Sequence, residues 1–268
     1  MKMERGPTAQ YANALPRPWS VKRTYDLYLD KTRPGWTNAR IISAVVDVDD
    51  FAARAWLPPG FEPSEVARAT IFAAWYPESS YNIAYREAAI LLHARHRGRA
   101  VFYCPWIVVD DDTALILGRE MLGFPKKIAV LTHTLNDDGE GHASVSRGGT
   151  PLLTFHAERP CPVRDAVLFS KPIVNVAMSP TLAAGVLIRM SVPERIHCAF
   201  EVDLHLSVKG SLHDPLDALG IGSRTVRGHT MVMDLAVPPE PAGILPPVRP
   251  IGLVSPRWLA SQLPFRTF

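Results

Sequence analysis

The sequence has few cysteines, and none of the three lies close to another. Cys104, Cys161 and Cys198 form no Cys-x-x-Cys pair, so neither a disulfide framework nor a cysteine zinc site is predicted, and a reducing, cytoplasmic setting is expected. A long apolar run is also missing, because the longest, 182–192, is interrupted by Arg189. The N-terminus has no apolar signal-peptide core. We therefore expect a protein that neither spans a membrane nor is exported.

A large net charge is absent as well. The chain has 29 Lys and Arg against 26 Asp and Glu, which leaves +3, and 47% of its 268 residues are hydrophobic. This is the composition of an ordinary globular protein. One local basic run, HARHRGR at 93–99, has no aromatic residues between its charges, which favours a charged hairpin tip over a nucleic-acid patch. We expect no nucleic-acid partner.

The common catalytic and nucleotide-binding signatures are missing too. The sequence contains no GxGxxG, GxxxxGK[ST], HExxH or GxSxG. His93 and His96 are the closest pair among nine histidines, and on a strand they would point to opposite faces, which is poor geometry for one metal ion. We expect no metal, nucleotide or other cofactor.

Hydrophobic residues alternate with polar ones in short segments separated by turn residues, which is typical of β-strands. Turns are predicted at Arg97-Gly98, at 136–139 and at Gly148-Gly149. Strands are predicted over 40–48, 67–76, 83–95, 100–109, 127–135, 142–147, 152–159, 196–207 and 229–237. The predicted fold class is mainly β (α+β), an antiparallel sheet closed into a barrel or folded into a double sheet.

A few short helices interrupt this pattern. One is predicted to begin at Asp49 or Asp50, whose carboxylate can cap the helix, and to stop before Pro58. Another runs from about Asp112 to Gly123, and a single helical turn precedes Gly220.

The 25 prolines are concentrated near both ends of the chain. Proline disfavours regular elements. We predict a single domain over 1–268, with a Pro-rich N-terminal arm at 1–36 and a Pro-rich C-terminal tail at 238–268.

The segment that carries chemistry is GREMLGFPKK, residues 118–127. Lys126 and Lys127 follow a Gly-x-Pro turn in an apolar stretch, where a desolvated ammonium costs several kcal/mol. Burial lowers the pKa of a lysine, and only a neutral amine attacks a carbonyl. On a strand the two lysines point to opposite faces, so only one can line a given pocket. The alternative is that both amines reach solvent at the strand end.

This segment resembles the active-site signature of the acetoacetate decarboxylase family, in which Gly-Arg-Glu is followed by Pro-Lys-Lys. The resemblance extends to VDVDDFAARAWLPPGFEP at 46–63 and SLHDPLDALG at 211–220. It implies that Lys126 forms a Schiff base with the substrate and that Lys127 helps to hold or tune it. The family is itself the standard example of a lysine activated by desolvation or by a cationic neighbour.

The same resemblance implies roles for two other positions, Glu87 and Arg40. Tyr85-Arg86-Glu87 matches the Tyr-x-Glu of the family, which makes Glu87 the proton-shuttling carboxylate. Arg40 lies near the position of the family arginine and would receive a substrate carboxylate. Phe124 and Phe72 are expected to line the site and to exclude water. The family also implies a symmetric homo-oligomer.

The sequence departs from the family at one acidic position. The family carries a second glutamate before the one matched to Glu87, and the corresponding place here is Ile71-Phe72. The first-ranked function is decarboxylation of a small β-keto acid such as acetoacetate through a lysine iminium and enamine. A Schiff-base aldolase or dehydratase acting on pyruvate-like 2-oxo acids, and a non-catalytic ligand-binding barrel, are the alternatives.

Overall fold

The computed structural model describes residues 35–179, 184–235 and 249–254. The predicted N-terminal arm, except for its last two residues, and most of the predicted C-terminal tail lie outside these ranges. Within them the chain forms fifteen strands, two α-helices and one 3-10 helix. The strands are β1 (Trp36–Asp47), β2 (Phe61–Pro63), β3 (Arg68–Tyr76), β4 (Glu78–Ser79), β5 (Tyr85–His96), β6 (Arg99–Val109), β7 (Lys126–Ile128), β8 (Val130–Leu135), β9 (Gly141–Arg147), β10 (Thr150–Pro162), β11 (Ile173–Ser179), β12 (Ala184–Met190), β13 (Glu194–Val208), β14 (Ser223–Leu235) and β15 (Arg249–Val254). The helices are α3 (Asp50–Trp56), α4 (Asp112–Leu122) and η1 (Leu216–Leu219).

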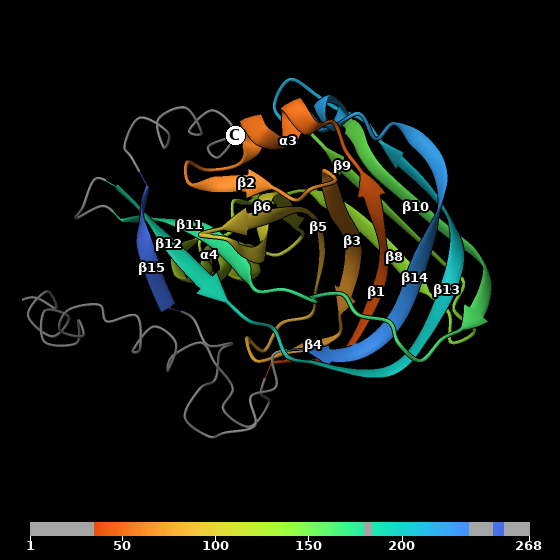
Figure 1. Cartoon of the computed structure of the whole chain (residues 1–268). Coiled ribbons are helices and arrows are strands. Elements are labelled where there is room, and N and C mark those ends of the chain that lie inside the picture. Colours follow the sequence, from red (N-terminus) through yellow and green to blue (C-terminus); the bar gives the residue numbers. More distant parts are fainter. Residues whose placement is uncertain (1–34, 180–183, 236–248, 255–268) are drawn as a thin grey trace, which may run out of the picture.

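All strands belong to one strongly curved sheet (Figure 1). Its main path runs β15-β12-β11-β6-β5-β3-β1-β14-β13-β10-β9-β8. Neighbours are antiparallel except that β6 pairs in parallel with β7 and with β11. The mainly β prediction is confirmed, but barrel closure is not, because no ladder joins β8 to β15 in the described part of the chain.

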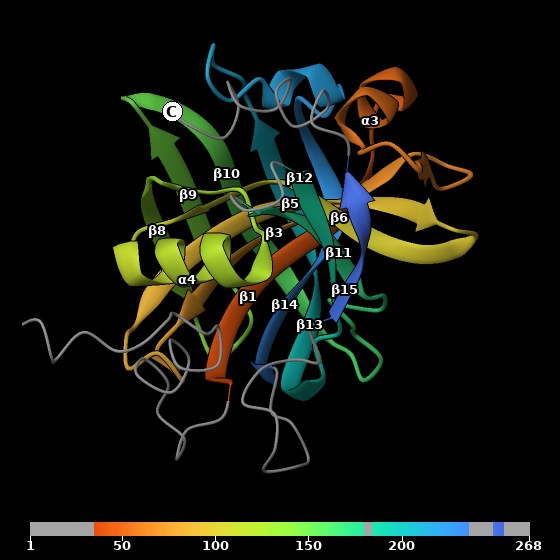
Figure 2. The same cartoon turned by 90° about the vertical axis from the view of Figure 1, so that its left-hand side faces the viewer.

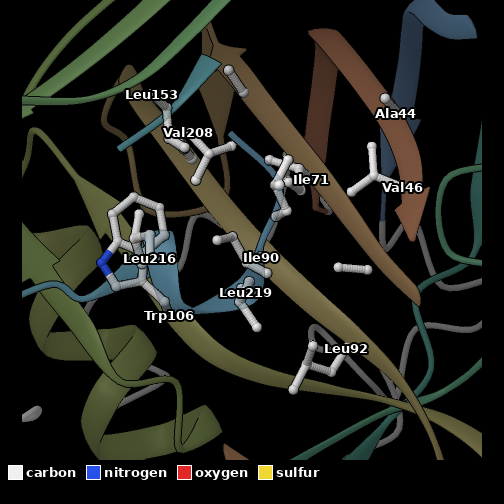
Figure 3. Close-up of a cluster of buried hydrophobic side chains, with 14 of the residues drawn as sticks. Ala44, Val46, Ile71, Ile90, Leu92, Trp106, Leu153, Val208, Leu216 and Leu219 are labelled. Carbon is white, nitrogen blue, oxygen red and sulfur yellow. The ribbon is translucent and has the colours of Figure 1, made fainter. Parts of the chain in front are cut away.

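The central strands are buried on both faces, because successive side chains point into two different cores. On β5, Ala88, Ile90 and Leu92 join the first core, whereas Ala89 and Leu91 join the second. The first core also takes side chains from β8, β9 and β10, which curl over this face. Figure 3 shows part of it, with Ile71, Ile90, Leu153 and Val208 close together. Shifting a residue by one position along a central strand therefore moves its side chain from one core to the other.

Both predicted α-helices are confirmed, and each starts at a capping aspartate. The Asp49 carboxylate accepts from the Ala52 N–H at 2.8 Å and the Asp111 carboxylate from the Ala114 N–H at 2.9 Å. Helix α4 ends at Gly123, which is left-handed with φ 68°. A Cβ there would lie 2.7 Å from the backbone nitrogen of Ala177, so the end of α4 requires glycine. Neither α-helix, nor the short 3-10 turn described with them, is long and apolar enough to cross a membrane.

The predicted strands appear with changed ends, most of all at β14, which begins at Ser223 and not at 229. The basic run 93–99 spans the β5–β6 hairpin tip. Arg97 and Gly98 have positive φ, as that turn requires. The predicted strand 127–135 is divided into β7 and β8, which pair with different neighbours. Strands β2, β4, β11, β12 and β15 were not predicted. Strand β15 lies within the Pro-rich tail and occupies a sheet edge, where Pro250 is tolerated.

Candidate active site

Lys126 is the first residue of β7 and points into the second core. A Gly-Phe-Pro turn leads from α4 into this short strand, which pairs in parallel with β6 so that Lys126 lies opposite Ile107. The Lys126 side chain is only 6% exposed. Its amine lies 5.5 Å from the centre of the Tyr85 ring and 5.9 Å from that of Phe124. The amine is therefore held among aromatic side chains inside the fold.

The partner of this amine is Glu87 of β5, the strand that pairs with β6 on the side away from β7. Lys126 Nζ lies 2.7 Å from Glu87 Oε2, and the Glu87 side chain is 10% exposed. Tyr76 OH donates to the other carboxylate oxygen at 3.4 Å. Burial raises the pKa of Tyr76 well above its usual value and the Glu87 charge adds to this, so the phenol keeps its proton as a donor. Amine and carboxylate are close enough to exchange a proton directly.

Gly118 of α4 makes room for the lysine. A Cβ on Gly118 would lie 2.5 Å from both Cδ and Cε of Lys126 and 3.0 Å from Nζ. No side chain larger than hydrogen fits there unless the lysine moves. The first glycine of the 118–127 signature therefore acts sterically, by letting the lysine chain pass across the helix. Helix α4 packs against β6, β7 and β11, and Figure 2 shows it on the side of the sheet that faces the viewer.

The amine and carboxylate face a cavity whose walls are otherwise apolar or aromatic. Among the lining residues that the structure describes, Lys126 and Glu87 are the charged ones. The others are Trp36, Phe72, Tyr76, Tyr81, Tyr85, Ala89, Leu91, Ile107, Leu122, Phe124, Phe169, Ile173, Met190, Val192 and Leu235. The predicted residues Phe72 and Phe124 thus lie where they were expected. An apolar surround strengthens every electrostatic interaction at the pair, because little water screens it.

Two fixed contacts shape the aromatic wall. Trp36 Nε1 donates to Tyr85 OH at 2.8 Å, and the Phe169 ring meets Phe72 edge to face at 5.9 Å between centroids. Phe169 lies in a connecting segment whose backbone is held by Glu194, which accepts from the N–H groups of Phe169 and Leu168. Burial raises the pKa of Glu194, and these two hydrogen bonds act against that rise. The segment that carries Phe169 is therefore anchored to β13.

Arg40 does not line this cavity, which corrects the prediction that it receives the substrate carboxylate there. Its guanidinium donates to the Leu135 carbonyl at 2.6 Å and to Asp137 at 3.1 Å. On β1 the neighbours Ala39 and Ile41 enter the second core, whereas Ile42 enters the first. Because side chains alternate along a strand, Arg40 lies on the face opposite Lys126.

Lys127 is buried as well, but on the other side of β7. Its amine donates to Asp214 at 2.8 Å and to the His213 carbonyl at 3.2 Å. Burial lowers the pKa of Lys127, against the opposing effect of Asp214. Lys127 is therefore not a group of the Lys126 cavity, and any influence on Lys126 passes through the strand. The alternative in which both amines reach solvent is wrong, since both side chains are 6% exposed.

Several residues of the site were not identified from the sequence. Tyr76, Trp36 and Phe169 carry no local signal that separates them from other core aromatics. Asp214 lies in the 211–220 segment, but nothing there indicates a lysine partner. Gly118 could have been found, because a glycine inside a helix is unfavourable and needs a reason. Across 35–179, 184–235 and 249–254, no three His, Cys, Asp or Glu side chains are placed to hold a metal ion.

The sequence was compared with protein-family models and with curated proteins. The family model described as acetoacetate decarboxylase matches residues 15–240. No protein of the curated set matches the sequence.

Several solved structures share the fold. Acetoacetate decarboxylase from Legionella pneumophila superposes with a TM-score of 0.72 at 16% identity, covering 94% of this chain and 98% of its own. A second acetoacetate decarboxylase structure gives 0.73 at 17% identity, with 88% and 96% covered. The enduracididine biosynthesis enzyme MppR, solved in complex with pyruvate, gives 0.64 at 20% identity, with 80% and 88% covered. At these identities the structural likeness establishes the fold.

Proposed function

Because this chain belongs to the acetoacetate decarboxylase family, we propose that it is a carbon–carbon lyase whose Lys126 amine forms a Schiff base with a small oxo acid. The observation that carries the proposal is the buried contact of 2.7 Å between Lys126 Nζ and Glu87 in a cavity of apolar walls. A lysine in such a setting is a candidate nucleophile; acetoacetate decarboxylase is itself the standard case of this activation.

The first part of the reaction is iminium formation. Glu87 accepts a proton from the Lys126 ammonium, and the neutral amine attacks the substrate carbonyl carbon. Loss of one water molecule then leaves the protonated imine, the iminium. The proton held by Glu87 is available for the departing hydroxyl. Apolar walls favour this dehydration because they exclude competing water.

In the second part the iminium accepts electrons from the bond to the carboxylate. For a β-keto acid the carbon–carbon bond breaks, CO2 leaves, and its electron pair becomes the enamine. Protonation at carbon and hydrolysis then release the ketone and the free lysine. A cavity with few charges favours this step, because the negative charge of the carboxylate disappears in it.

A second candidate reaction is aldol addition or dehydration on a pyruvate-like 2-oxo acid. This reaction is favoured by the lack of a carboxylate at the position of the second family glutamate. Phe72 takes the cavity-facing place there, whereas Ile71 enters the first core. This reaction uses the same iminium and enamine intermediates, but the enamine then adds to an aldehyde or loses water. MppR, which shares the fold, is described in complex with pyruvate.

The decisive experiment traps the imine with borohydride. We expect incubation with acetoacetate, followed by reduction, to add the substrate-derived mass to the peptide that contains Lys126, with release of CO2. Lys126→Ala is expected to abolish adduct and turnover, whereas Lys127→Ala keeps the adduct and lowers turnover. Equal and negligible effects of the two substitutions would contradict the assignment.

The controls separate the candidate reactions. An adduct with pyruvate but no CO2 from acetoacetate, followed by condensation when an aldehyde is added, indicates the aldolase. Loss of water from a hydroxylated 2-oxo acid indicates the dehydratase. An adduct without any turnover indicates a binding protein, and no adduct with any oxo acid would exclude Schiff-base chemistry.

A further inference from the structure

A second hollow lies on the other side of β7 and shares no lining residue with the Lys126 cavity. We call it the Lys127 hollow. It spans about 680 Å³ of space, part of which is open solvent. It is lined by Ala55, Trp56, Pro105, Trp106, Lys127, His213, Asp214, Pro215 and Leu216. We infer that the Lys127 hollow is a binding site for a small planar anion of the aromatic carboxylate class.

The charge of the ligand follows from the groups around Asp214. This carboxylate is 1% exposed and accepts hydrogen bonds from Lys127, Arg147 and the Trp106 indole, at 2.8, 2.8 and 2.9 Å. One carboxylate is thus shared by two cations. Burial raises the pKa of Asp214, but the hydrogen bonds from Lys127 and Trp106 outweigh this and lower it. With the aspartate ionised, the cluster retains an excess positive charge.

The excess positive charge of this cluster faces the hollow, because Lys127 is one of the lining residues. Its amine has three donor positions, and the Asp214 carboxylate and the His213 carbonyl take two of them. Burial lowers the pKa of Lys127, and the neighbouring charges of Arg147 and Arg119 add to that effect. A ligand carboxylate beside the amine would offset the repulsion among these cations. A neutral ligand would not.

The shape of the ligand follows from the walls. Trp56 closes the C-terminal end of α3, and Trp106 comes from β6. The Trp106 ring is fixed by its bond to Asp214 and, as Figure 3 shows, lies beside Leu216. With two prolines completing the wall, a flat apolar body fits against indole and proline surfaces, and its anionic end meets Lys127.

Binding of benzoate to the full chain tests this, with benzamide as the uncharged probe of the same shape. Ligand-observed NMR and tryptophan fluorescence report binding without requiring turnover. The blocking variant is Ala55→Trp, because Ala55 is an exposed helix residue at the hollow and its substitution leaves the charged cluster untouched. The matched control is Phe51→Trp, which adds tryptophan to the same helix at a site 82% exposed and outside the hollow.

We expect saturable benzoate binding and at least about tenfold weaker benzamide binding. Ala55→Trp and Lys127→Met are each expected to weaken benzoate by a similar factor, whereas Phe51→Trp and Lys126→Ala leave it unchanged. The inference is overturned if benzoate does not saturate in the millimolar range, if benzamide binds equally well, or if Ala55→Trp behaves like Phe51→Trp. Loss of binding in Lys126→Ala would place the ligand in the other cavity. None of these outcomes depends on the proposed catalytic activity.

Discussion

At the scale of single residues, the candidate site is one buried ion pair. Lys126 and Glu87 are each nearly inaccessible and lie 2.7 Å apart. Breaking a buried pair by removing one partner costs about 3–5 kcal/mol, because the other charge is left uncompensated. In the proposed reaction Glu87 is therefore the base that takes a proton from Lys126, because its carboxylate is in direct contact with the amine.

Glu87→Gln keeps the size of the side chain and removes its capacity to take a proton. We expect CO2 release from acetoacetate to fall by about 10²–10⁴-fold, the usual contribution of a positioned acid or base. The borohydride adduct at Lys126 should still form, but more slowly. Glu140→Gln, an exposed change between β8 and β9, is the matched control. Turnover of Glu87→Gln equal to that of the control would remove Glu87 from the mechanism.

At the scale of elements, α4 and β7 together place the lysine. The helix ends at Gly123, the chain turns through Pro125, and β7 returns past the helix so that Lys126 crosses Gly118. This arrangement explains the spacing between Gly118 and Lys126 in the signature: the helix residue supplies the space and the strand residue supplies the amine.

Gly118→Ala is expected to displace the lysine without unfolding the protein. The added methyl would meet flexible lysine carbons rather than backbone, and alanine raises helix propensity by about 1 kcal/mol over glycine. We expect the rate of adduct formation to fall at least about tenfold, as for other small displacements of reacting groups, while the melting temperature is kept or raised. The control is Ile116→Ala, an exposed change on the same helix. An unchanged rate in Gly118→Ala would show that the close approach does not matter.

At the scale of the whole molecule, the curved sheet folds over its own first core and creates two separate hollows. Strand β8 packs across onto β3 and β5, which are remote from it along the sheet path. His133 lies on this strand, and burial lowers its pKa to about 4, with Arg86 and Arg40 adding to the shift. The imidazole is therefore neutral in the folded protein at pH values where an unfolded histidine is charged.

This histidine predicts a loss of stability in acid. Because the folded pKa lies below the unfolded value of about 6.5, the unfolded state binds the proton first, and stability falls as pH drops from about 6.5 to about 4. Between pH 7 and pH 4.5 we expect the free energy of unfolding to fall by about 2 kcal/mol more in the natural protein than in His133→Leu. Urea denaturation at both pH values measures this, with the exposed change His156→Leu as control. An equal acid loss in the natural protein and His133→Leu would refute the assignment.

The sequence by itself determined most of the local structure and indicated the amine on which the proposed function depends. Strand alternation, the capping residues Asp49 and Asp111, and the left-handed glycines act over a few neighbours, so the elements could be predicted from them. The Pro-Lys-Lys signature and the Tyr-x-Glu resemblance indicated Lys126 and Glu87, which form the buried pair of the candidate site. These features are properties of short segments and do not require knowledge of the pairing between distant strands.

Only the tertiary structure decided which groups meet. Arg40 lies on the face of β1 opposite the Lys126 cavity, because moving one position along a strand moves a side chain to the other face of the sheet. Asp214 became the partner of Lys127 through a contact between segments far apart in sequence. The open path of the sheet and the two hollows on either side of β7 likewise follow from long-range strand pairing, which the pattern within each strand does not specify.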